Sequence, residues 1–327
     1  MLPRIFKRLG PGRNGLVLLV IFVLAALVSP RSQRGDIIFL SLGNLTDALR
    51  AITPVGITSL AMTWVVLSAG IDLSVGSVAA LSGVVAGRLL VHWHPEGMPM
   101  SLHVALAVTV AVLACTGVGL MNGALTASLS IQPFVITLAS MIGVRGFALW
   151  LCNNERIGLG VGTDAAGLFG EWFSNKWVML GIYALLGLAF LILLNRTVFG
   201  RYVRAVGDNF GAARLAGLPV LRVQLGVYAL SGLMAGVAGV LLAARTTTGD
   251  PNGGVAMELD VIAVVVIGGA SLAGGRGGIL GTLNGAMIVG VVTNILGLRN
   301  VDFNLQLVLK AAIIVLAVAL QRRKLRA

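Results

Sequence analysis

Residues 195–223 read NRTVFGRYVRAVGDNFGAARLAGLPVLRV, a polar segment between two apolar stretches that are each long enough to cross a membrane. Within it, residues 211–217 (GAARLAG) predict a short helix. Ala, Arg and Leu favour helix, Gly217 suits the C-terminal cap, and Pro219 prevents continuation. The segment carries five arginines: Arg196, Arg201, Arg204, Arg214 and Arg222. A short helix on a basic loop between two spans is predicted to be a contact site for a component outside the membrane.

The composition is that of an integral membrane protein. Apolar residues make up 57% of the 327 residues and charged residues only 11%. Repeated apolar runs of roughly 18 residues indicate helical spans rather than a β-barrel. Of the 24 Lys and Arg, 13 fall in residues 1–13, 195–223 and 322–326. Because clustered cations mark cytoplasmic loops, the net charge of +12 indicates orientation in the membrane and not nucleic-acid binding.

The apolar runs predict an all-α polytopic membrane protein, a single domain over residues 1–327. About ten transmembrane helices are expected, with the short cytoplasmic helix between spans 6 and 7. An amphipathic stretch, residues 36–52, is predicted as a separate helix on the outer face. Ten crossings place both termini and residues 195–223 on the cytoplasmic side. The predicted spans are residues 15–29, 54–68, 75–91, 102–125, 133–151, 177–194, 224–244, 259–270, 279–296 and 305–320.

Asp72 is the most informative acid in the sequence. A carboxylate beside apolar helices costs roughly 2.5–3.5 kcal/mol on insertion scales, so it needs partners or water. Asp72 could line a transport path or an inner gate. Alternatively, Asp72 and Ser74 cap the helix that follows them, and the two interpretations are compatible. Glu258 and Asp260 present the same choice, as caps of span 8 or as acids near its outer mouth.

The sequence contains no motif for catalysis, a cofactor or a metal. It has no G-x-x-x-x-G-K-[S/T] segment to bind the phosphates of ATP, and no Ser-His-Asp or Cys-His arrangement. His92 and His94 do not share a helix face, so a metal site is not expected there. Cys115 and Cys152 are predicted to be packing residues. If ATP drives this protein, another polypeptide hydrolyses it.

Four blocks of the sequence resemble the membrane permease subunit of bacterial ABC-type sugar importers of the ribose, arabinose, galactose and xylose branch. They are residues 70–78 (GIDLSVGSV), 131–137 (IQPFVIT), 205–207 with 212–217, and 258–263 with 266–275. The resemblance extends over nearly the whole chain. It implies a bacterial inner membrane protein that forms a homodimer or a heterodimer with a similar permease. Two cytoplasmic ATP-binding subunits and a periplasmic sugar-binding protein would complete the complex.

The resemblance also implies that the short cytoplasmic helix couples the permease to the ATPase. The family usually carries acids just before the Ala-Ala pair, whereas this chain has Phe210 and Gly211 there. The candidate coupling residues are Gly211, Ala212, Ala213, Arg214, Leu215 and Gly217.

A neutral sugar needs hydroxyl and amide partners along its route rather than an ion pair. Transport by alternating access through such a route is expected. The candidate residues of the path or gate are Asp72, Ser74, Asn122, Thr126, Asn284 and Thr293. The alternative is an ion-coupled secondary transporter, which would use intramembrane acids such as Asp72 and Asp260.

Overall fold

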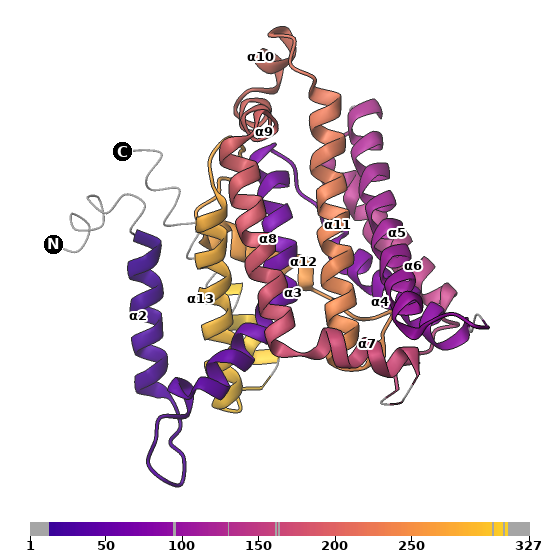
Figure 1. Ribbon diagram of the computed structural model, residues 1–327. Helices are drawn as coiled ribbons and strands as arrows, with labels where there is room; N and C mark the ends of the chain where they lie inside the picture. Colours follow the sequence, from indigo (N-terminus) through magenta and orange to yellow (C-terminus); the bar gives the residue numbers. More distant parts are fainter. Residues whose placement is uncertain are drawn as a thin grey trace, which may run out of the picture.

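The protein is a bundle of helices (Figure 1). The computed structural model describes residues 13–93, 96–129, 131–160, 162, 164–302, 304–309 and 311–312. Within this part, two short strands, β1 (Ile157–Gly158) and β2 (Thr248–Gly249), pair antiparallel. The helices are α2 (Arg13–Val28), the 3₁₀ helix η1 (Ile38–Leu40), α3 (Leu42–Leu67), α4 (Val75–His92), α5 (Met100–Leu129), α6 (Pro133–Leu151), α7 (Ala165–Ser174), α8 (Lys176–Arg196), α9 (Val198–Asp208), α10 (Phe210–Leu215), α11 (Val220–Thr246), α12 (Met257–Ile267) and α13 (Ile279–Leu298).

Long apolar helices confirm the prediction of an all-α polytopic membrane protein. Within the described residues, seven helices are long and apolar enough to cross a membrane: α3, α4, α5, α6, α8, α11 and α13. Helix α2 has 16 residues and α12 only 11. The last predicted span, residues 305–320, lies mostly outside the described residues. The predicted total of about ten is therefore reached only if α2, α12 and residues 305–320 also count as crossings.

The prediction of a separate surface helix over residues 36–52 is wrong. The structure continues most of that stretch into the next predicted span as one helix, α3, of 26 residues with Pro54 inside it. A proline can lie within a helix of a packed membrane bundle because neighbouring groups satisfy the freed backbone atoms. On either side of Pro54, the hydroxyls of Thr53 and Thr58 donate to carbonyls one turn earlier, at 2.8 and 2.9 Å.

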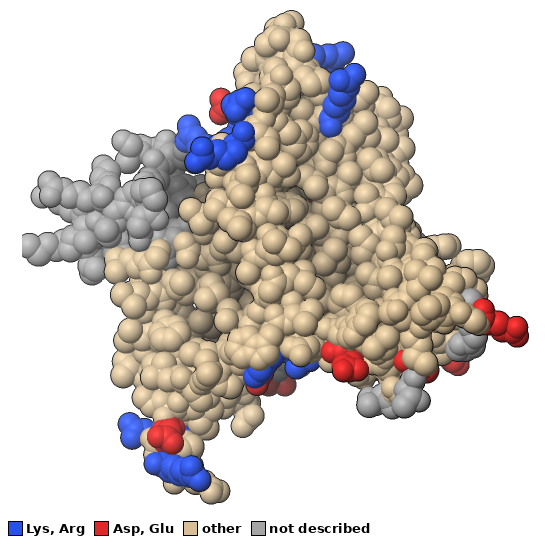
Figure 2. Space-filling view, viewed as in Figure 1, with Lys and Arg blue, Asp and Glu red and all other residues tan. Residues whose placement is uncertain are grey.

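The two ends of the bundle differ in charge. Helices α9 and α10 lie at one end and α7 lies at the other (Figure 1). Lys and Arg gather near α9 and α10, whereas most of the Asp and Glu in view lie at the opposite end, with a few Lys and Arg among them (Figure 2). The positive-inside rule predicts that the end with α9 and α10 faces the cytoplasm. We call it the cytoplasmic end, and the opposite end the outer end.

Helix α11 lies at the centre of the bundle and packs against α3, α4 and α5. It meets α5 through glycines. A Cβ on Gly119 would overlap the carbonyl of Tyr228, and a Cβ on Gly232 would overlap the carbonyl of Cys115. Only glycine allows the two backbones to approach this closely. The small residues around Gly232 therefore serve the packing of α11 against α5.

Candidate functional site

Two non-helical segments enter the bundle from opposite ends. The inner connector, residues 68–74, leads from α3 to α4, and the outer segment, residues 250–256, leads from β2 to α12. The outer segment reaches the first turn of α4, just after the inner connector, where Gly76 lies so close to the carbonyl of Gly254 that a Cβ would not fit. In membrane proteins, irregular backbone is tolerated inside the bundle where it is buried or lines a water-filled cavity. A transport route is therefore best sought along these two segments.

A buried carboxylate fixes the inner connector. Asp72 is 2% exposed. One of its oxygens accepts hydrogen bonds from the backbone N–H and the hydroxyl of Ser74, at 2.9 and 2.6 Å. The other accepts from the hydroxyl of Ser231 in α11, at 2.7 Å. Asp72 thus caps the amide of the residue just before α4. Among the described residues no Lys or Arg forms an ion pair with it, so three neutral donors stabilise the charge.

Helices α5 and α6 join the same cluster. The side-chain amide of Asn122 donates to the hydroxyl of Ser74 at 3.0 Å. The hydroxyl of Thr137 donates to the carbonyl of Ile71 at 3.1 Å. The polar cluster therefore ties the inner connector to α5, α6 and α11. Its side chains are those of Asp72, Ser74, Asn122, Thr137 and Ser231.

Three of the predicted path residues thus come together, and two members of the cluster were missed. Ser231 and Thr137 are single hydroxyl residues in apolar helices, where such residues commonly bond to their own backbone. Thr137 does so as well, to the carbonyl of Pro133 at 3.0 Å. Ser231 stands 159 positions after Asp72, and only the packing of α11 brings them into contact.

A cavity of about 760 Å³ opens at the cytoplasmic end, beside the inner connector. The predicted path residue Thr126 lines it, and so do Phe210 and Arg214 of α10. Its other polar side chains are Ser68, Ser128, Gln132 and Gln224. The volume lies in the range of roughly 300–1,000 Å³ that is typical of small-molecule sites. Neutral hydroxyl and amide groups outnumber the single arginine on its wall, which suits an uncharged polar ligand.

The short helix predicted at residues 211–217 is present as α10, one residue earlier at its start and two residues shorter at its end. The side chain of Asn209 caps it by accepting from the N–H of Ala212 at 2.9 Å. Gly217 has a φ of +74°, as expected of a C-terminal capping glycine. The same loop contains a second helix, α9, which the sequence analysis did not separate from its surroundings.

Every residue of α10 except Ala213 is exposed at the cytoplasmic end. Leu215 is 91% exposed and Phe210 is 48% exposed, whereas Ala213 is 5% exposed and faces the protein. Exposed apolar side chains that gather on a small element commonly mark a protein contact. The other coupling candidates on the exposed part are Gly211, Ala212, Arg214 and Gly217.

The two remaining path candidates lie away from this cluster. Asn284 and Thr293 are half-buried in α13, which packs on α2, α3, α8 and α12. Neither forms a side-chain hydrogen bond with another described residue. Two polar contacts that α13 does make were missed. The amides of Asn294 and Asn44 donate to each other at 2.9 and 3.1 Å, and the hydroxyls of Thr282 and Thr63 share a hydrogen bond, so both contacts join α13 to α3.

The described residues contain no group of three or more His, Cys, Asp or Glu that could hold a metal ion. Both cysteines are buried, as predicted for packing residues, Cys115 in α5 and Cys152 just after α6. His94 lies outside the described residues.

A family model described as "Branched-chain amino acid transport system / permease component" matches residues 44–318. Similar curated proteins include the ribose import permease proteins of Escherichia coli strain K12 and Bacillus subtilis strain 168. Each is 37% identical, over 94% of this chain and 93% of the relative for E. coli, and over 98% and 94% for B. subtilis. The L-arabinose ABC transporter permease protein of Azospirillum brasilense is 38% identical, over 94% of this chain and 86% of the relative. No solved structure matches the chain significantly.

Proposed function

This chain belongs to the family of membrane permease components of ABC import systems, and we propose that it moves a monosaccharide by alternating access. It is a multi-pass inner membrane protein and the permease subunit of a sugar importer. It is not an enzyme, because the ATPase activity of such systems belongs to separate subunits. The sugar permeases among its relatives favour a sugar as cargo over the amino acid in the description of the family model.

The exposure of two apolar side chains on α10 is the observation that carries the coupling part of the proposal. A six-residue helix at the cytoplasmic end presents a leucine that is 91% exposed and a phenylalanine that is 48% exposed. Their burial against a cytoplasmic ATP-binding subunit would remove this apolar surface from water. Phe210, where the family usually carries an acid, replaces a charged contact by an apolar one.

The position of α10 supports transmission from the ATPase to the sugar route. Phe210 and Arg214 line the cytoplasmic cavity, so a shift of α10 changes the shape of that cavity. We propose that sugar leaves through this cavity past Thr126. The buried cluster of Asp72, Ser74 and Asn122 forms the inner gate at its end. Asn284 and Thr293 remain proposed path residues without a described contact to this cavity.

We further infer three kinds of partner. Cytoplasmic ATP-binding subunits contact α10, and a periplasmic sugar-binding protein docks on the outer end. A second permease chain, identical or similar, completes the membrane part of the complex. Both termini are proposed to lie in the cytoplasm, with α10. The support for these inferences is the family and the distribution of charge (Figure 2).

Reconstitution tests the function directly. The chain is placed in liposomes alone under a proton or sodium gradient, and separately with its ATP-binding subunit, binding protein and ATP. We expect uptake of radiolabelled sugar only in the second case. Uptake by the chain alone would favour the ion-coupled alternative, in which acids such as Asp72 and Asp260 bind the coupling ion.

Substitutions at one exposed position test the role of α10. Leu215→Glu places a charge in the proposed contact and is expected to reduce ATP-driven uptake at least about tenfold, while Leu215→Met retains it. Because Leu215 is 91% exposed, neither change disturbs the packing of the chain. Arg214→Glu with Ala213→Glu is also expected to abolish uptake, although buried Ala213 makes that pair a less selective test. Uptake by Leu215→Glu at the parent rate would contradict the assignment.

A further inference from the structure

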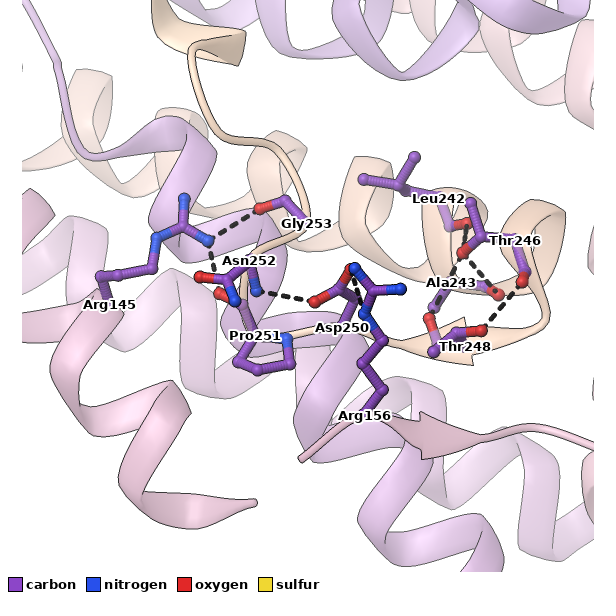
Figure 3. A network of polar contacts seen from close by, with 10 residues as sticks. All are labelled: Arg145, Arg156, Leu242, Ala243, Thr246, Thr248, Asp250, Pro251, Asn252 and Gly253. Carbon is purple, nitrogen blue, oxygen red and sulfur yellow. Dashed lines mark hydrogen bonds and ion pairs between the residues drawn. The ribbon is translucent and has the colours of Figure 1, made fainter. Parts of the chain in front are cut away.

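An arginine on a membrane helix forms hydrogen bonds with the backbone of the outer segment. Arg145 lies in α6, six residues before its end, or about 9 Å along the axis. One guanidinium nitrogen donates to the carbonyls of Pro251 and Gly253, at 2.5 and 2.8 Å (Figure 3). Asp250 and Glu258 lie close enough to stabilise its charge. An arginine at such a position is costly unless it is paired, which marks it as a functional residue.

The outer segment, to which Arg145 donates, lies across the bundle at its outer end. Gly249, at its start, lies against the backbone of Gly83 in α4, and Gly254 lies against Gly76. On its other side, Arg156 forms an ion pair with Asp250 at 3.1 Å, which is also drawn in Figure 3. Residues 250–254, which we call the outer gate, are therefore held between α4 and the guanidinium of Arg145.

A second cavity, of about 280 Å³, lies beneath the outer gate. Small residues of α4 and α11 form one wall, including Ala80, and Asp250, Gly253 and Gly254 of the outer gate form another. This cavity is already partly open at its side, and a displacement of the gate would widen its connection to the outside. In the present structure the larger cavity, at the cytoplasmic end, is the one beside α10.

A short helix connects the outer gate to the cytoplasmic end. Helix α12 begins three residues after the gate and ends before the glycine-rich turn of residues 271–278. In that turn, the N–H of Gly275 donates to the carbonyl of Leu67 at 3.0 Å. Gly274 lies against the carbonyl of Gly207 in α9, too close for a Cβ. α10 follows α9 directly. A displacement of these two helices would therefore push the turn, and α12 would carry that movement to the outer gate.

We propose that Arg145 is the positioning residue that holds the outer gate closed while the cytoplasmic cavity is open. When the ATP-binding subunits move α9 and α10, α12 transmits the shift and the two hydrogen bonds from Arg145 break. The cavity beneath the gate then receives sugar from the outer side. This inference rests on alternating access, the proposed function, and adds to it the contact that keeps the outer end shut.

Cysteine labelling tests this inference without requiring sugar transport. Ala80→Cys places a thiol in the cavity beneath the gate, and the full chain is expressed with its partners in intact cells. A membrane-impermeant maleimide is added outside, and the chain with only buried Cys115 and Cys152 gives the background. We expect Arg145→Ala to raise the labelling rate about tenfold or more, because each charge-assisted hydrogen bond contributes roughly that factor. Arg145→Lys, a flexible point charge, should raise it less.

Arg88 provides the matched control. Its guanidinium also donates to a backbone carbonyl near the outer end, that of Leu151 at 2.7 Å, but does not touch the gate. Arg88→Ala should leave the labelling rate unchanged. Equal labelling of Arg145→Ala and its parent, at equal amounts in the membrane, would overturn the inference. If Arg145→Ala raises labelling but ATP binding in the parent does not, the gate contact stands and the proposed drive by the ATPase fails.

Discussion

The outer and cytoplasmic ends of this permease are built differently. At the outer end, residues 250–254 are held by side chains that reach across from α6 and from the segment after it. At the cytoplasmic end, a cavity of about 760 Å³ lies beside a six-residue helix with two exposed apolar side chains. Polar contacts can break without unfolding a helix, and a short helix can move as a body. The difference fits the proposed alternating access, in which a cytoplasmic movement releases the outer end.

The largest effect is expected where the two ends are joined. A Cβ on Gly207 would overlap the carbonyl of Leu67, so Gly207→Val should force α9 from α3 and from the glycine-rich turn. We expect about 3 kcal/mol of destabilisation and uptake at background level. Thermal unfolding in detergent and an uptake assay measure the two effects. Ala205→Val, at an exposed position of the same helix, is the control and should behave as the parent.

A smaller effect is expected at the inner gate. Asp72→Ala removes the acceptor of three hydrogen bonds and leaves the donors of Ser74 and Ser231 buried. The expected cost is about 2 kcal/mol of stability, with a corresponding fall in the unfolding temperature. Asp72→Asn retains one acceptor oxygen and should lose less. If Asp72→Ala is as stable as its parent, the cluster does not fix the inner connector.

The smallest effect is expected from the exposed ion pair of the outer gate. The side chain of Arg156 is 71% exposed, so its pair with Asp250 contributes less than about 1 kcal/mol. Arg156→Ala should change uptake less than twofold. With Ala80→Cys as the reporter, it should also raise outside labelling far less than Arg145→Ala does. If Arg145→Ala and Arg156→Ala raise labelling equally, the hydrogen bonds from Arg145 are no more important to the gate than the exposed ion pair of Arg156.

Features that depend on a few neighbouring residues could be predicted from the sequence. The residues GAARLAG carry their own helix propensity and a capping glycine, and α10 forms there. The cost of burying Asp72 predicted that it would have partners, and it has three donors. The predicted boundary between residues 52 and 54 is wrong because Pro54 does not interrupt a helix that its neighbours support.

Contacts between distant segments could not be predicted in the same way. Ser231 reaches Asp72 only because glycines let α11 approach α5. Arg145 offered a signal, an arginine within an apolar span, that the sequence analysis did not use. Its partners are backbone carbonyls of the outer segment. Every residue has such a carbonyl, so the residue types in the sequence do not reveal the pairing. The roles of both residues follow from helix packing.

The sidedness of Leu215 tests the account most directly. Leu215→Cys is reacted with an impermeant maleimide in right-side-out and in inside-out membrane vesicles, with and without the ATP-binding subunit. The account predicts labelling only in inside-out vesicles, and protection from labelling when the ATP-binding subunit is bound. Labelling in right-side-out vesicles, or no protection by the bound subunit, would contradict the role of α10 as the contact that couples ATP to sugar movement.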